Sequence, residues 1–133
     1  MPHLHFDLNL SPPVDAKRHF GAAVVSRFAE IMDTGTDHIG VTLRCHGPDD
    51  LVFGRASDPS AGIAFVNADI RLGRTVHQKR QLALAFIDEV HRAFGIPKEA
   101  VYVIFTEHDG EHFQLVEKVL PSWSPGEDPL APT

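Results

Sequence analysis

The sequence is poor in cysteine, tryptophan and tyrosine, and it has no long apolar run. Its 133 residues include one Cys, one Trp and one Tyr. A single cysteine, Cys45, cannot form an intramolecular disulfide, which fits a reducing compartment. No apolar segment approaches the ~20 residues needed to span a bilayer, and the first residues lack the basic segment and apolar core of a signal peptide. We therefore expect a cytoplasmic protein with no membrane partner.

Basic residues are also too few for an electrostatic nucleic-acid binder. The chain has 12 Lys and Arg against 18 Asp and Glu, a net charge of −6, so no nucleic-acid partner is expected. An apolar fraction of 43% and a charged fraction of 23% are typical of a globular domain, and the length suffices for one core. We expect one domain over residues 1–120 and a flexible C-terminal tail over residues 121–133.

The first half of the chain predicts a strand, a helix and a second strand. Residues 3–10 alternate apolar and polar side chains, as in a half-buried strand. Ser11-Pro12-Pro13 then opens a helix whose apolar residues recur at helical spacing, and Gly35 is its expected stop. Residues 38–45 alternate again, with Cys45 on the apolar side.

The second half repeats this order. Residues 64–72 alternate, and Thr75 with Gln78 has the form of a capping box that begins a helix ending at Gly95. Residues 101–105 predict a fourth strand, and residues 112–119 a short additional one. The sequence therefore predicts an α/β (α+β) fold: two β-α-β units forming one four-stranded mixed sheet with both helices on one face.

The sheet face away from the helices is expected to be mostly polar. Such a face suits either exposure to solvent or the lining of an oligomer whose sheets surround a central axis, and we favour the oligomer. Its members are His5, Asp7, Thr42, Arg44, Asn67, Asp69, Arg71 and Tyr102.

Pro2 is the first candidate for chemistry. Met-Pro is a start from which the initiator methionine is normally removed, leaving a secondary amine at the terminus. A free α-amino group has a pKa near ~8, and burial or neighbouring cations lower it, giving a neutral base at pH 7. The dipeptide alone is a weak signal, since many chains begin this way by chance.

Several longer motifs strengthen the interpretation of Pro2 as a catalytic residue. The opening MPHLHF, the stretch IAFVNADIRLGRT and the helix KRQLALAFIDEV resemble the tautomerase superfamily, and within it the 5-carboxymethyl-2-hydroxymuconate isomerase family. DLVFG, SDPSAGIA and FGIPKEAVYV resemble the macrophage migration inhibitory factor branch more broadly. The resemblance extends from Pro2 to about Phe113 and implies the tautomerase fold.

The resemblance also implies an isomerase that needs no cofactor. It implies that Pro2 is the catalytic acid/base, that Arg44 and Arg74 hold the carboxylates of a small dienol acid, and that Tyr102 lines the pocket of a neighbouring subunit in a homotrimer. An arginine suits this task because its planar guanidinium binds a carboxylate through two hydrogen bonds. Thr42 stands where that family has a further arginine. This difference concerns which substrate is bound more than which reaction is catalysed.

Other readings stay open at this point. They are a tautomerase acting on phenylpyruvate or a similar enol, a decarboxylase of the same superfamily, and a non-catalytic trimer that binds a protein. We expect Arg71 to pair with Asp7 or to lie near a threefold axis. The nine histidines lack the supporting pattern of a zinc site, so no metal is assigned.

Overall fold

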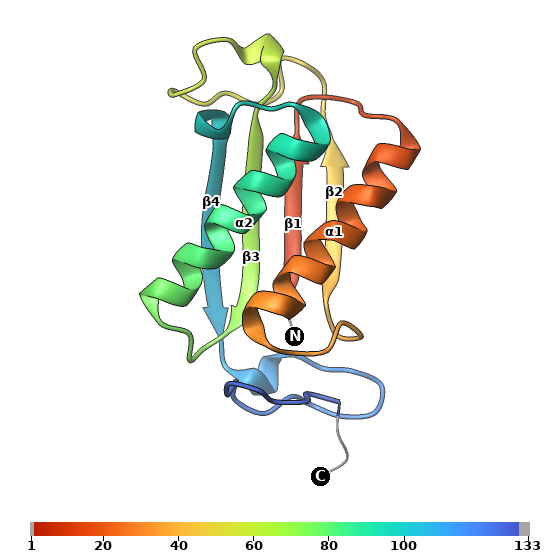
Figure 1. Ribbon diagram of the computed structural model, residues 1–133, viewed down its shortest axis with the longest axis vertical. Coiled ribbons are helices and arrows are strands. Elements are labelled where there is room, and N and C mark those ends of the chain that lie inside the picture. Colours follow the sequence, from red (N-terminus) through yellow and green to blue (C-terminus); the bar gives the residue numbers. More distant parts are fainter. Residues whose placement is uncertain (1, 131–133) are drawn as a thin grey trace.

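Four strands form one sheet, and two long helices cover one of its faces (Figure 1). The computed structural model describes residues 2–130. The strands and helices are β1 (His3–Leu8), α1 (Val14–Met32), β2 (Gly40–Cys45), β3 (Ala64–Arg71), α2 (Val76–Phe94) and β4 (Val101–His108), with short 3-10 turns at Pro59–Ala61, Lys98–Ala100 and Gly110–His112. No helix of the described chain has the length and apolar character that a membrane span requires.

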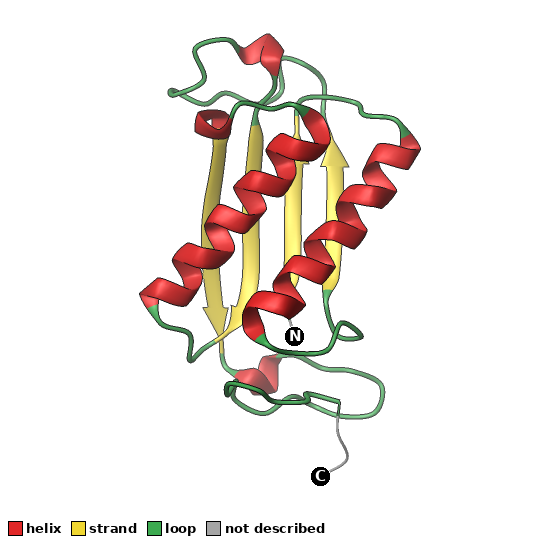
Figure 2. Cartoon of the chain, in the orientation of Figure 1, coloured by secondary structure: helices red, strands yellow, loops and turns green. Residues whose placement is uncertain are grey.

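The strand order across the sheet is β2-β1-β3-β4. β1 runs parallel to β2, β3 runs parallel to β4, and the two β-α-β units meet along an antiparallel β1–β3 pair. This confirms the predicted mixed sheet with both helices on one face, as Figure 2 shows. The register places the start of β1 beside the end of β3, with His3 opposite Asp69.

The core lies between the sheet and the two helices. Apolar side chains of β1 and β3 point toward the helices and are almost fully buried, and Phe20, Phe28 and Phe86 meet them from the helices. Phe6 lies edge-on to Phe20 with ring centroids 4.8 Å apart, an arrangement that aromatic pairs favour. The predicted capping box of α2 is present, with reciprocal hydrogen bonds between Thr75 and Gln78.

Several predicted boundaries need correction. α1 ends at Met32, and its C-cap Asp33 adopts the left-handed conformation (φ 49°) expected two residues later at Gly35. β4 continues three residues beyond the predicted Phe105, because residues 106–108 still pair with β3. The segment 112–119 contributes only an isolated bridge between Gln114 and Val119 rather than a strand.

The C-terminal segment, residues 121–130, lies against the end of the sheet where β3 and β4 finish. The carbonyl of Pro121 accepts a hydrogen bond of 2.7 Å from Arg71, and Glu127 forms an ion pair with the same guanidinium. Trp123 lies over Arg74, with 4.9 Å between the guanidinium carbon and the ring centroid. The flexibility expected of residues 121–133 stays a prediction, and residues 131–133 lie outside the described chain.

Candidate active site

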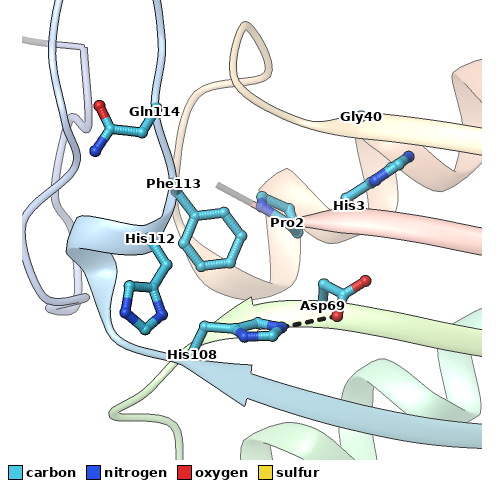
Figure 3. A pocket seen from close by; sticks show the side chains of 8 residues that line it. All are labelled: Pro2, His3, Gly40, Asp69, His108, His112, Phe113 and Gln114. Carbon is cyan, nitrogen blue, oxygen red and sulfur yellow. Dashed lines mark hydrogen bonds and ion pairs between the residues drawn. The ribbon is translucent and has the colours of Figure 1, made fainter.

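A cavity of about 560 Å³ opens at the end of the sheet where β1 begins (Figure 3). Its volume is in the range of small-molecule sites. Pro2, which is buried, lines it from the start of β1, and the turn after β4 closes its other side. The described lining residues are Pro2, His3, Gly40, Asp69, His108, His112, Phe113 and Gln114.

Strand register explains why these residues meet. Pro2 precedes β1, and its carbonyl accepts a hydrogen bond of 3.0 Å from the Gly40 amide at the start of β2. β3 runs in the opposite direction, so its last residues reach the same end of the sheet, where Asp69 lies opposite His3. β4 is parallel to β3 and delivers His108 to this end.

Asp69 lies between two histidines at the edge of the cavity. Nε2 of His108 donates to Oδ1 of Asp69 at 2.8 Å, a contact that Figure 3 shows, and Nε2 of His5 lies 3.2 Å from Oδ2. Arg44 donates to Nδ1 of His5 at 2.9 Å. Since an arginine can only donate, His5 must accept at Nδ1 and carry its proton on Nε2, facing Asp69. Two hydrogen bonds and the His5–Asp69 ion-pair contact between them therefore connect Arg44 with His108 through the Asp69 carboxylate.

The predicted substrate arginine Arg44 does not line the cavity of its own chain. It lies exposed on the sheet face opposite the helices and reaches the site only through His5 and Asp69. His3 shares this face and donates to or accepts from the Thr42 hydroxyl at 2.8 Å. Its pKa is lowered, chiefly by burial and then by the neighbouring His5.

The second predicted arginine, Arg74, is buried and is not among the described residues that line the cavity. It donates to the Arg71 carbonyl at 2.9 Å and lies between the rings of Phe28 and Trp123. Burial lowers the pKa of Arg74 to about 10, and the adjacent positive charge of Arg71 adds to the effect. The guanidiniums of Arg74 and Arg71 both remain charged at neutral pH.

Arg71 is 1% exposed, and its expected pairing with Asp7 is wrong. It forms its ion pair with Glu127, while Asp7 accepts a hydrogen bond of 2.8 Å from His46. Burial lowers the pKa of Arg71 to about 10. Of these two neighbouring buried cations, Arg71 has a carboxylate partner, and Arg74 forms no ion pair within the described residues.

His38 lies near this cation pair and is 3% exposed. Burial, followed by nearby positive charges that include Arg71 and Arg74, lowers its pKa to about 4. His38 is therefore neutral at pH 7, and it adds no third positive charge to this end of the sheet.

Tyr102, the last predicted site residue, lies at the opposite end of the sheet from Pro2. It is half exposed on the uncovered sheet face, where its ring lies 5.7 Å from that of Phe53 and 6.5 Å from that of Phe65. It therefore cannot contact a ligand beside Pro2 of its own chain. Of the four predicted site residues, only Pro2 lines the cavity.

Sequence reasoning missed His108, Phe113 and the role of Asp69 in the cavity. Asp69 was placed on the polar face, but no function was assigned to it. His108 lay beyond the predicted end of β4. If β4 is extended in register with β3, Thr106 becomes the partner of Asp69 and His108 lies two positions further on. The alternation of residues 101–105 alone does not reveal this extension.

A group that is able to hold a metal ion lies in the turn after β4. Asp109, Glu111 and His112 each offer a ligand atom, and these atoms lie within 4.8 Å of one another. All three residues are exposed. Exposed acidic turns of this kind are common without a metal, and the expectation of no metal or cofactor stays a prediction.

Comparison with known proteins supports this fold. The model of the Tautomerase enzyme family matches residues 65–120, the part from β3 through β4 and the following turn. No curated protein matches the chain by sequence. Among solved structures, the chain is similar to N1, a member of the cis-3-chloroacrylic acid dehalogenase family, with 22% identity, a TM-score of 0.80 and coverage of 93% of this chain and 85% of that one.

Two further structures share the architecture. The macrophage migration inhibitory factor of Toxoplasma gondii has 17% identity and a TM-score of 0.76, covering 88% of this chain and 98% of its own. A fused wild-type 4-OT symmetric trimer has 21% identity and a TM-score of 0.75, covering 90% and 94%. At these identities the likeness is one of fold.

The duplicated β-α-β sheet with a proline at the start of β1 is the tautomerase fold. The Tautomerase enzyme family model matches residues 65–120 of this fold, a little over two fifths of the chain. These matches do not single out the 5-carboxymethyl-2-hydroxymuconate isomerase branch.

Proposed function

We propose that this protein is a cofactor-independent tautomerase in which the secondary amine of Pro2, freed by removal of Met1, transfers a proton on a small enol acid. The observation that carries the proposal is the position of Pro2, buried and lining the cavity beside the Asp69–His108 pair. A secondary amine at this place can act first as a base and then, as prolinium, as an acid.

The simplest reaction uses Pro2 for both transfers. The neutral amine takes the hydroxyl proton of a dienol acid, the electron pair of the O–H bond forms the carbonyl, and the prolinium returns a proton to a distant carbon. The product is the conjugated ketone. The cavity holds the substrate in place, so positioning supplies part of the rate enhancement.

The substrate class we propose is a carboxylated dienol of the 2-hydroxymuconate type, with 5-carboxymethyl-2-hydroxymuconate as the leading candidate. Support comes from the two buried guanidiniums of Arg71 and Arg74 at this end of the sheet. Arg71 is paired with Glu127, whereas Arg74 forms no ion pair within the described residues, and the negative charge of Glu107 acts on it at longer range. A low-polarity surrounding makes such a charge a strong attraction for a substrate carboxylate. Arg74 is the proposed carboxylate-binding residue of the same chain.

Arg44 and Tyr102 lie on the uncovered sheet face, so the contact with substrate that we propose for them requires a neighbouring subunit. The exposed apolar surface there, to which Tyr102 and Ile104 contribute at 48% exposure each, favours burial against a second copy. The related fused 4-OT structure is a symmetric trimer. We therefore propose a homotrimer with sites at its interfaces, acting in the cytoplasm.

The test is an enol–keto absorbance assay on purified protein whose mass shows that Met1 is absent. The panel contains phenylpyruvate enol and a 2-hydroxymuconate-type dicarboxylate, and light scattering is measured in parallel. Pro2→Ala should lower kcat by about 10²-fold or more, since it removes the secondary amine. Unchanged activity in Pro2→Ala, or no activity of the native trimer on any enol acid, would overturn the proposal and leave a non-catalytic binding protein.

A further inference from the structure

The sheet carries two histidine–aspartate pairs with nearly the same geometry. His108 donates to Asp69 and His46 donates to Asp7, in each case from Nε2 to Oδ1 at 2.8 Å. The side chains are exposed to similar degrees, 33% and 25% in the first pair and 35% and 26% in the second. Only the first pair lines the cavity of Pro2; Asp7 lies opposite Phe65, toward the far end of the sheet.

The hydrogen bond to Asp69 fixes the tautomer of His108. With its proton on Nε2, the neutral ring has a lone pair on Nδ1, which is the basic nitrogen. Within residues 2–130, Nδ1 of His108 has no hydrogen-bond partner, so it is available to a ligand. Asp69 also stabilises the imidazolium that forms when Nδ1 takes up a proton.

Asp69 is itself held in place. Its second oxygen faces Nε2 of His5, whose orientation is fixed by the hydrogen bond from Arg44. Both oxygens of the carboxylate are therefore occupied, one by each histidine. This anchoring orients the His108 ring without using the face that borders the cavity. Figure 3 shows the rings of Pro2 and His108 bordering the same space, with Phe113 beside them.

We propose that His108 is a second proton-transfer residue, which works at the substrate oxygen while Pro2 works at carbon, and that Asp69 is its positioning residue. The inference rests on the tautomerase function proposed above. It assigns to two residues the two proton transfers that Pro2 alone makes in the simplest reaction. The titratable groups nearest to His108 are Asp69 from β3, which accepts its hydrogen bond, and His112 from the following turn, whose ring centroid lies 6.5 Å away. Arg71 is the partner of His108 in strand register, and its guanidinium is paired with Glu127.

The proposed reaction converts an enol to a ketone. Nδ1 of His108 takes the hydroxyl proton, and the O–H electron pair becomes part of the new carbonyl. In this two-group reaction Pro2 begins the turnover as prolinium, whereas in the one-group reaction above it begins as the neutral amine. The former C=C electron pair takes a proton from the prolinium nitrogen, which becomes neutral. Water then carries a proton from the imidazolium back to Pro2, so the pair holds one proton before and after each turnover.

The central test compares His108→Gln with the matched control His46→Gln in the native trimer, using phenylpyruvate enol. We expect His108→Gln to lower kcat by about 10²-fold with little change in KM, the usual worth of a general acid/base. His46→Gln removes an equivalent hydrogen bond outside the cavity, and its kcat should stay within about twofold of the native value. Equal kcat values for the two variants would overturn the proposal.

Two further variants separate proton transfer from a structural role. Asp69→Asn should lower kcat by about tenfold and leave the melting temperature near that of His46→Gln. Added imidazole should restore part of the activity of His108→Ala, because a free imidazole can enter the space that the side chain leaves. Absence of this rescue, together with a native kcat in Asp69→Asn, would contradict a proton-transfer role for His108. Pro2→Ala is measured beside them. Loss of activity in Pro2→Ala with native activity in His108→Gln would overturn this inference alone, whereas native activity in Pro2→Ala would overturn the function itself.

Discussion

Arg71 and Glu127 form an ion pair across 56 positions of the sequence, and it joins the end of β3 to the C-terminal segment. Arg71 is 1% exposed, and the Glu127 side chain is 10% exposed. Burying a cation at the end of a strand is tolerable only with a partner, because an unpaired charge loses its hydration without compensation. The C-terminal segment therefore supplies the partner of a charge that the fold buries.

Glu127→Gln should accordingly destabilise the protein. It leaves the Arg71 charge buried with only the Pro121 carbonyl and a neutral amide, and breaking a buried pair in this way costs about 3 kcal/mol. Urea unfolding at pH 7 measures the loss. The control is Glu117→Gln, an exposed position where we expect a change of no more than about 0.5 kcal/mol. Equal stability of the two variants would mean that the ion pair contributes nothing.

A second prediction concerns Gly110, where the C-terminal segment crosses the turn after β4. A Cβ at this glycine would collide with the backbone of Pro121, so Gly110→Ala should push the segment off the sheet. Trp123 is the only tryptophan, and its emission should shift to longer wavelength as the ring leaves Arg74. Gly54→Ala is the control, because a Cβ there meets nothing within 4 Å. An unshifted spectrum in Gly110→Ala would show that the segment is held by other contacts.

The sequence predicted the sheet because its signals are local. Alternation in β1 and β3 and the capping box at Thr75 depend on neighbouring residues alone, and each appears in the structure. The failures lie where distant parts of the chain decide the outcome. β4 runs to His108 because β3 offers it partners, and no pattern within residues 101–105 reveals that.

The candidate site was less accessible to sequence reasoning for the same reason. Pro2 was found from its place at the terminus and from family resemblance. Asp69 and His108 belong to the cavity only through strand register. The prediction that Arg71 pairs with Asp7 or lies near a threefold axis missed its partner, Glu127, because Glu127 lies in a segment whose composition suggested disorder.

A third prediction tests the terminal amine. Any residue attached to Pro2 converts its nitrogen into an amide, which has no basicity, so a preparation that retains Met1 should be inactive. Protein made with a cleavable N-terminal extension should gain activity on enol acids when cleavage exposes Pro2, as followed by intact mass and absorbance. The same extension at the C-terminus is the control and should leave kcat within about twofold. Full activity before cleavage would exclude Pro2 as the base.

A fourth prediction separates recognition of carboxylates from chemistry at Arg74. Arg74→Ala should weaken a dicarboxylate by about 1.5–3 kcal/mol in kcat/KM, the worth of a charge-assisted hydrogen bond, and a monocarboxylate by less. Because Arg74 is buried between two aromatic rings, its loss also tests packing. Arg74→Lys keeps the cation and is the control for charge, and melting temperatures identify any misfolded variant. Equal losses for both substrates would mean that Arg74 does not distinguish them by their carboxylates.

The fifth prediction concerns stability in acid. In the unfolded chain His38 has the ordinary histidine pKa of 6.5, whereas burial and then nearby positive charges lower it to about 4 in the fold. Between these pH values the unfolded state binds more protons, so the free energy of unfolding falls as the pH drops from 6.5 toward 4. The full shift corresponds to about 3 kcal/mol.

His38→Gln removes this titration, so its free energy of unfolding should fall less between pH 6.5 and pH 4 than that of the native protein. Urea unfolding at several pH values gives the slopes. The difference in slope is the readout, because the substitution also changes packing at a buried site and so shifts stability at every pH. His19→Gln, at an exposed position of α1, is the control for removing an imidazole. Parallel curves for His38→Gln and the native protein would show that His38 takes up its proton equally well in the folded and unfolded states.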